Sequence, residues 1–346
     1  MVTLPWDHTW AGRIDRHIVH SPALEGNPLG DPADRPLWVY VPPGYDDEPD
    51  RRYPTVYVLQ GYGSFVSTWA NRAWNREPYP EVADRLFAEG GTPPCLLVFV
   101  DAWTSYGGSQ YVDSAGTGRY HTYLCEDVVS FVDSRYRTLA AAPYRGLQGK
   151  SSGGFGAMIT PMLRPDLFGA LATHAGDALY ELLYLPEIGR SVRTLRAFGG
   201  SPAAWWEDHR RRPPEARGED FDLLMMYGVA ACFSADDDGT PQLPFDTASG
   251  RLRPDVWARW QAWDPVLMVD RYADALRGLG AIWIDGGRSD QYWLDLGAVA
   301  FRDALAGVGV TETVHFELFD GTHSNIDWRY PRSLDWLARK LSPPSR

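Results

Sequence analysis

The sequence predicts an α/β fold built on a mostly parallel sheet of about eight strands. Two observations support this prediction. Short runs rich in β-branched residues alternate with longer segments of helical periodicity, and several of the short runs are apolar throughout, as are strands buried on both faces. Strands that alternate with helices form βαβ units, whose strands run parallel. The chain has 346 residues, 44% of them hydrophobic, which is enough to bury a substantial core.

Eight segments have the character of strands. The first two, residues 16–24 and 36–45, are joined by a turn rich in Gly, Pro and Asp and have no helix between them, so we expect the sheet to begin antiparallel. The other six strands are expected at residues 54–60, 94–102, 144–149, 168–176, 280–287 and 313–321. Helical spacing of apolar residues predicts helices at 79–90, 120–136, 292–309 and 332–341.

Residues 177–265 interrupt this alternation. They contain the polar stretches "HRRRPPEARGED" and "SADDDGTPQLPFDTASG", with helix-like pieces between them and no set of strands. We therefore expect a single domain over residues 1–346, in which residues 177–265 form a cap-like insertion before the seventh strand.

Composition and charge exclude several classes of protein. A formal net charge of -12 argues against a nucleic-acid-binding protein, which usually has a basic face. Three separated cysteines suggest neither a disulfide framework nor a zinc site, and we expect no metal and no cofactor. No signal peptide or membrane-spanning apolar run is evident. We expect a soluble, cytoplasmic protein that acts on a small molecule, and leave open whether it is a homo-oligomer.

The stretch "RGLQGKSSGGFGAM", residues 145–158, allows two interpretations. A phosphate-binding loop needs a glycine, four residues and then Gly-Lys-Ser/Thr, but the position of that first glycine is occupied by Tyr144. A nucleophile elbow needs Gly-x-Ser-x-Gly between a strand and a helix. The residues from Gly149 to Gly153 match this pattern after a predicted strand, so Ser151 is the candidate nucleophile.

A serine hydroxyl needs a base, and the base needs an acid that orients it. His323 lies in "FDGTHSNIDW", just after the last predicted strand, where a side chain can reach the serine from the carboxyl edge of the sheet. The acid is expected after the preceding strand, in "AIWIDGGRSDQYW". Asp290, beyond the Gly-Gly turn, is the preferred acid, and Asp285 at the strand end is the alternative.

Two backbone N–H groups are expected to bind the oxyanion. One belongs to Ser152, directly after the nucleophile, and the other to Tyr62 in "LQGYGS", with Gly61 as the alternative. Gln60 in the same loop is a candidate substrate-binding residue. Trp103 follows the fourth predicted strand, and Trp293 follows the loop of the candidate acid; they either line an aromatic acyl pocket or pack in the core or at the rim.

Together these motifs resemble the putative esterase family of α/β-hydrolases, which includes esterase D, enterochelin esterases and feruloyl esterases. The resemblance covers most of the chain, including "VYVPPGYDDEPDRRYPTVYVLQGYG", the elbow, "GGRSDQYW" and "FDGTHSNIDW". It implies an α/β-hydrolase fold with Ser151 as nucleophile, Asp290 as acid and His323 as base. The chain departs from many relatives in having Gln60 where they have His, and Ser152 where they have Met.

We therefore expect a serine carboxylic-ester hydrolase that acts through an acyl-enzyme on a small to medium ester. An acyltransferase with the same three residues is the alternative within catalysis. A non-catalytic binding protein with this fold is the alternative of another class. The natural ester cannot be inferred from these motifs.

Overall fold

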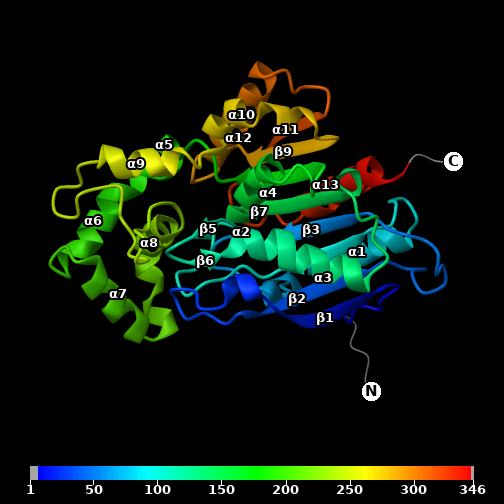
Figure 1. Ribbon diagram of the computed structural model, residues 1–346, viewed down its shortest axis with the longest axis horizontal. Coiled ribbons are helices and arrows are strands. Elements are labelled where there is room, and N and C mark those ends of the chain that lie inside the picture. Colours follow the sequence, from blue (N-terminus) through cyan, green and yellow to red (C-terminus); the bar gives the residue numbers. More distant parts are fainter. Residues whose placement is uncertain (1–6, 344–346) are drawn as a thin grey trace.

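The computed structural model describes residues 7–343 and contains an eight-stranded sheet (Figure 1). The spatial order is β1-β2-β4-β3-β7-β8-β9-β10. All five pairings from β4 onward are parallel, and β2 is antiparallel to both of its neighbours. The strands are β1 (Arg13–His20), β2 (Asp34–Val41), β3 (Thr55–Leu59), β4 (Leu96–Val100), β7 (Arg145–Ser151), β8 (Ala170–Gly176), β9 (Ala281–Gly287) and β10 (Val314–Phe319).

The predicted sheet and its antiparallel start are thereby confirmed. Each of the eight strands lies within three residues of the predicted segment at both ends except for the far ends of β1 and β2, which stop four residues earlier. The structure adds a two-stranded hairpin, β5 (Asp113–Ser114) and β6 (Gly118–Arg119), that the sequence does not predict, since two-residue strands carry no periodic signal.

Helices cover both faces of the sheet. One face packs against α1 (Tyr79–Ala88) and α13 (Arg329–Leu341). The other packs against α3 (Val129–Arg135), α4 (Ser152–Leu163) and α12 (Leu294–Gly307). The central strand β3 is buried on both sides: Val56 and Val58 face the first layer, and Tyr57 and Leu59 face the second. This explains why the strand is apolar throughout.

The predicted helix at residues 120–136 is one continuous helical segment whose central part is π-helical rather than α-helical. It comprises α2 (Tyr120–Thr122), a π-helical stretch η3 (Tyr123–Val128) and α3. A π-helical turn inserts extra backbone into a helix and is frequent near functional sites.

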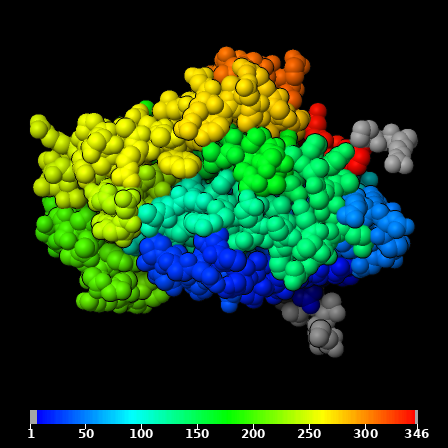
Figure 2. All heavy atoms as spheres, viewed as in Figure 1, coloured from blue at the N-terminus to red at the C-terminus, as the bar shows by residue number. Residues whose placement is uncertain are grey.

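Residues 177–265 are mainly helical and form a lobe at one end of the molecule, drawn from green to yellow in Figures 1 and 2. Their apolar side chains join the same cluster as those of α12 and β9; Trp205 and Trp260, both fully buried, pack in it. This shared core supports the proposal of one domain with an insertion. The helices of the lobe are α5 (Tyr180–Leu183), α6 (Ile188–Arg196), α7 (Pro202–Arg211), α8 (Phe221–Phe233) and α9 (Pro254–Gln261).

Between the lobe and β9, the chain forms α10 (Pro265–Arg271) and α11 (Ala273–Arg277). Over residues 7–343, every helix is too short or too polar to span a lipid bilayer. Because β3, β7, β8, β9 and β10 are parallel, the loops that follow them gather at one edge of the sheet, the edge where α/β proteins usually bind ligands.

Candidate active site

Ser151 lies at the sharp turn between β7 and α4. Its backbone has φ 57° and ψ -127°, a conformation that costs a non-glycine residue about 1–3 kcal/mol and is characteristic of functional positions. The flanking glycines are required sterically. A Cβ atom on Gly149 would lie 2.2 Å from the carbonyl oxygen of Gly153, and one on Gly153 would lie 2.3 Å from the carbonyl oxygen of Leu59. The turn thus has the geometry of a nucleophile elbow.

His323 lies in the loop between β10 and α13 and is 9% exposed. Its Nδ1 atom is 2.9 Å from Asp290 Oδ2, and the edge of its ring contacts Tyr292, with ring centroids 5.0 Å apart. The other oxygen of Asp290 accepts a hydrogen bond from the backbone N–H of Tyr292 (2.8 Å). A carboxylate on Nδ1 holds the ring so that Nε2 is the atom available for proton transfer.

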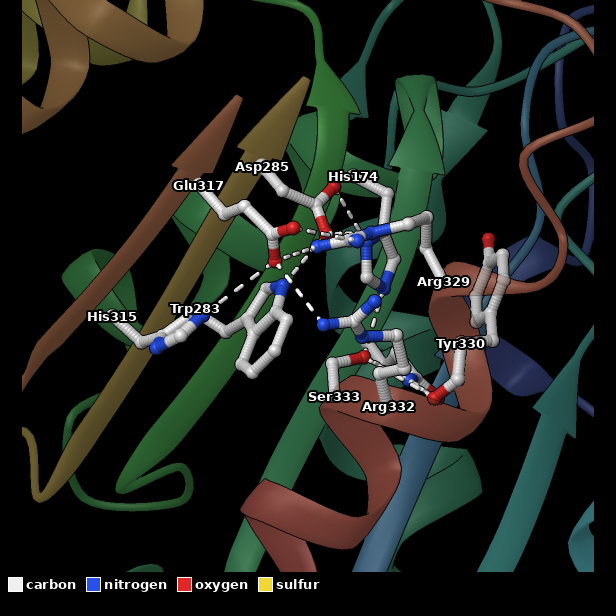
Figure 3. Close-up of polar contacts among 10 residues, drawn as sticks. His174, Trp283, Asp285, His315, Glu317, Arg329, Tyr330, Arg332 and Ser333 are labelled. Atoms are coloured by element: carbon white, nitrogen blue, oxygen red, sulfur yellow. Dashed lines mark hydrogen bonds and ion pairs between the residues drawn. The ribbon is translucent and has the colours of Figure 1, made fainter. Parts of the chain in front are cut away.

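Asp285, the alternative acid, belongs to a different network (Figure 3). Its carboxylate is fully buried and accepts from Trp283 Nε1 (2.7 Å) and Arg329 Nε (2.8 Å). It also bonds to Nδ1 of His174 (2.8 Å). Burial alone would raise the pKa of Asp285, but the charges and hydrogen bonds of His174 and Arg329 outweigh it and lower the pKa. Among the described residues, the carboxylate that bonds to His323 is therefore that of Asp290, which the sequence favoured. Asp285 bonds to His174 instead.

Asp177, which the sequence did not single out, contacts the candidate nucleophile Ser151. The hydroxyl of Ser151 donates to Asp177 Oδ1 (3.3 Å), and that of Ser152 donates to Oδ2 (3.0 Å). No hydrogen bond joins Ser151 to His323 within the described part of the chain. Burial raises the pKa of Asp177 to about 6. Its one sequence signal is that it directly follows β8, the strand next to the elbow strand, a position that polar residues commonly occupy.

The loop after β3 approaches the elbow closely. A Cβ atom on Gly61 would lie 3.7 Å from Ser151 Cβ, so the backbone of this loop borders the nucleophile. The side chain of Tyr62 points away from that position, since its hydroxyl donates to the carbonyl oxygens of Tyr106 and Leu224. Gln60 is 3% exposed and donates to the carbonyl oxygen of Ser64. The tyrosine side chain thereby anchors the loop whose N–H groups are the candidate oxyanion donors.

Ser151 and His323 line one cleft of about 400 Å³, which we call the Ser151 cleft. Two of the candidate substrate-binding residues are absent from its described lining. Trp103 stacks on Phe65, with centroids 5.2 Å apart, and Trp293 is 52% exposed. The apolar and aromatic part of the lining consists of Tyr62, Trp69, Leu183, Phe221, Met225, Tyr292, Leu294 and Tyr330, and the polar part includes Gln60, Ser64, Thr68, Asn71, Arg76, Lys150, Ser152, Asp177, Ser324, Asn325 and Asp327.

The apolar side chains that line the Ser151 cleft are therefore other than Trp103 and Trp293, for which packing at the rim was the alternative. The lobe supplies Leu183, Phe221 and Met225, from α5 and α8. Among residues 7–343, no group of three or more His, Cys, Asp or Glu side chains is arranged to hold a metal ion.

Comparisons with known proteins place the chain in a family. The profile of a family described as putative esterase matches residues 32–331. An endo-1,4-beta-xylanase/feruloyl esterase of Xylanibacter ruminicola is 24% identical over 152 residues, which make up 43% of this chain and 20% of that protein. The matched part of this chain thus spans about a fifth of the length of that relative.

Solved structures resemble the chain over nearly its whole length. A ferulic acid esterase has a TM-score of 0.62 at 18% identity, covering 96% of this chain and all of its own. An S-formylglutathione hydrolase from Agrobacterium tumefaciens has a TM-score of 0.57 at 16% identity, covering 97% of this chain and 98% of its own. At such identities the likeness concerns the fold, and it confirms the predicted α/β-hydrolase fold.

Proposed function

This chain belongs to the putative esterase family, as its motifs suggested, and from that premise we propose that it hydrolyses carboxylic esters through an acyl-enzyme on Ser151. The observation that carries the proposal is the strained serine of the elbow in a cleft that it shares with a carboxylate-bound histidine. Family membership supports ester hydrolysis as the reaction; the serine mechanism is our proposal.

In the first step, Ser151 Oγ attacks the ester carbonyl carbon while its proton passes to Nε2 of His323. The negative charge that develops on the carbonyl oxygen is stabilised by the backbone N–H groups of Ser152 and Tyr62. The tetrahedral intermediate collapses, the bond to the alkoxy group breaks, and the alcohol leaves with the proton from His323.

In the second step, water attacks the acyl-enzyme, with His323 again accepting the proton. Release of the carboxylic acid restores Ser151. Asp290 fixes the orientation of the imidazole and stabilises the imidazolium formed in both steps. For the attack, the Ser151 side chain must turn from Asp177 toward His323; such hydrogen bonds often tighten only when substrate is bound. No cofactor takes part in this scheme. A cytoplasmic location remains a prediction.

A fluorophosphonate probe combined with ester turnover tests the proposal. We expect the unaltered chain to take the label on Ser151 and to hydrolyse 4-nitrophenyl butyrate. Ser151→Ala should lose the label and about 10⁶-fold in kcat. Ser134→Ala, which alters an exposed serine on α3, is the matched control and should keep both. Labelling or turnover of Ser151→Ala at the level of the control would refute the mechanism.

A further inference from the structure

Lys150 lies in the Ser151 cleft, directly before the nucleophile at the end of β7. It is one of only two lysines in the chain, the other being Lys340 on α13. The elbow motif requires no particular residue at this position. The ammonium group is therefore a feature of this chain that the proposed mechanism does not use.

The charge of Lys150 has no direct partner. Among the residues that the structure describes, no hydrogen bond and no ion pair engages its ammonium group. Partial burial lowers the pKa of Lys150, and the surrounding charges of Asp327, Asp290 and Asp177 raise it less than burial lowers it. A partly buried charge without a partner is unfavourable, and an anionic ligand would relieve that cost.

The carboxylates near Lys150 are already engaged. Asp327 is 3.7 Å from Arg76, Asp290 bonds to His323, and Asp177 accepts from the hydroxyls of Ser151 and Ser152. The Arg76–Asp327 pair is internally neutral. Its two residues belong, like Lys150, to the lining of the cleft, so the ammonium group of Lys150 is the one positive charge of this corner without an ion-pair partner among the described residues.

Hydrogen-bond donors accompany this charge. Asn71 and Asn325 both line the same cleft, and within residues 7–343 their side-chain amides have no hydrogen-bond partner. We call Lys150, Asn71, Asn325, Arg76 and Asp327 the Lys150 corner. One positive charge with neutral amide donors suits a monoanion such as a carboxylate. A phosphate dianion would leave one negative charge unbalanced.

We propose that the Lys150 corner binds a carboxylate of the substrate, so that the enzyme prefers esters that carry a free carboxylate on the acyl or the alcohol part. The substrate class rests on the proposed esterase function, whereas the carboxylate site itself does not. The apolar side chains of the cleft would contact the hydrocarbon part of the same substrate.

Binding can be tested without turnover in the Ser151→Ala variant, which lacks the hydroxyl that would attack an ester probe. Reductive ¹³C-methylation keeps both lysines charged and gives each an NMR signal, which Lys150→Arg and Lys340→Arg assign. We expect monomethyl succinate, a monoanion, to shift the signal of Lys150 with saturation and to leave that of Lys340 in place. Dimethyl succinate, the neutral counterpart, should shift neither. Equal responses of the two lysines, or no response at Lys150, would overturn the carboxylate site.

Turnover then tests the substrate class. One pair of esters carries the carboxylate on the acyl part, 4-nitrophenyl hydrogen succinate against its methyl ester. The other carries it on the alcohol part, 3-acetoxybenzoate against its methyl ester. For at least one pair, we expect Lys150→Met to lower the ratio of kcat/KM for the acid over the neutral ester about tenfold to a hundredfold, as the loss of a charge-assisted hydrogen bond would.

We compare ratios because a disturbance of the adjacent elbow would change kcat/KM for the acid and for the neutral ester by the same factor. Such a disturbance leaves their ratio unchanged. Lys150→Arg should largely keep the ratio, and Lys340→Met, which removes the same charge far from the cleft, should leave it unchanged. A ratio in Lys150→Met equal to that of the unaltered chain would overturn the substrate class alone. Absence of any Ser151-dependent hydrolysis would overturn the esterase proposal and the substrate class, but not a carboxylate site shown by NMR.

Discussion

Replacing Asp290 or Asp285 by Asn should separate activity from stability. The two aspartates are five residues apart, each is buried, and each bonds to Nδ1 of a histidine. His323 lines the Ser151 cleft, whereas His174, on β8, is fully buried and its ring contacts Tyr330 of α13 (Figure 3). The same Asp→Asn substitution therefore removes one carboxylate charge from each of two similar Asp–His pairs that lie in different surroundings.

The size of each effect follows from the partners. In Asp290→Asn the amide no longer holds His323 in the tautomer that leaves Nε2 free to accept a proton, so kcat should fall on the order of 10³–10⁴-fold. The folded state loses the charge-assisted contact to His323, whereas the amide oxygen can still accept from the backbone N–H of Tyr292, so the cost is about 1 kcal/mol. Asp285→Asn leaves the buried Arg329 with only Glu317 as an anionic partner, at 2.6 Å, which should cost about 3 kcal/mol.

Urea unfolding and ester turnover, measured on both variants, check these values. Because folding lowers the pKa of Asp285 from its usual 3.8, its contribution is complete above about pH 4 and is lost as the pH falls further. The stability difference between Asp285→Asn and the unaltered chain should therefore narrow toward pH 3. Full kcat in Asp290→Asn, or a larger loss of kcat in folded Asp285→Asn than in Asp290→Asn, would refute the assignment of the acid.

Two further substitutions test the surroundings of the nucleophile. Burial raises the pKa of Asp177 from 3.8 to about 6, so the folded state binds a proton that the unfolded state has already released, and stability falls as the pH rises from about 4 to 6. Asp177→Asn removes this dependence, so its free energy of unfolding, relative to that of the unaltered chain, should rise by about 2–3 kcal/mol between pH 4 and 7. If urea titrations give the same pH dependence of stability for both proteins, the raised pKa of Asp177 is contradicted. Gly153→Ala places a Cβ 2.3 Å from the carbonyl oxygen of Leu59 and 2.8 Å from that of Gln60, which must displace the oxyanion loop and should lower kcat about 100-fold or more. Gly189→Ala, which meets nothing within 4 Å, is its control, and equal kcat values in the two alanine variants would show that the close contact is unimportant.

Much of the fold could be predicted because its signals are local. A strand such as β3 is buried on both faces by helices, so nearly every side chain in it is apolar. Chain order then restricted the acid and the base to the loops after β9 and β10, and the structure brings Asp290 and His323 together there. The elbow was recognisable because its turn excludes side chains at fixed positions.

The remaining features depend on contacts between distant segments. Trp103 follows a strand end at the expected edge of the sheet, but its ring stacks on Phe65 from a loop whose conformation no sequence pattern specifies. The apolar lining of the cleft instead includes residues of the lobe, Leu183, Phe221 and Met225, and the path of an insertion over a sheet edge is set by tertiary packing. Asp177 resembles any polar residue that ends a strand until its distance to Ser151 is known.

The buried ionisable groups of this protein lie in two different electrostatic environments. On the α13 side of the sheet, buried charges are matched: Asp285 and Glu317 surround Arg329, and removal of one partner should destabilise the fold. At the carboxyl edge of β7 and β8, burial disfavours the charged forms: it raises the pKa of Asp177 and lowers that of Lys150, and the backbone of Ser151 is strained. Groups held in unfavourable states stabilise a protein little, and they persist where binding or chemistry uses them. The matched network therefore stabilises the scaffold, and the residues at the carboxyl edge of β7 and β8 are where substrate should be sought.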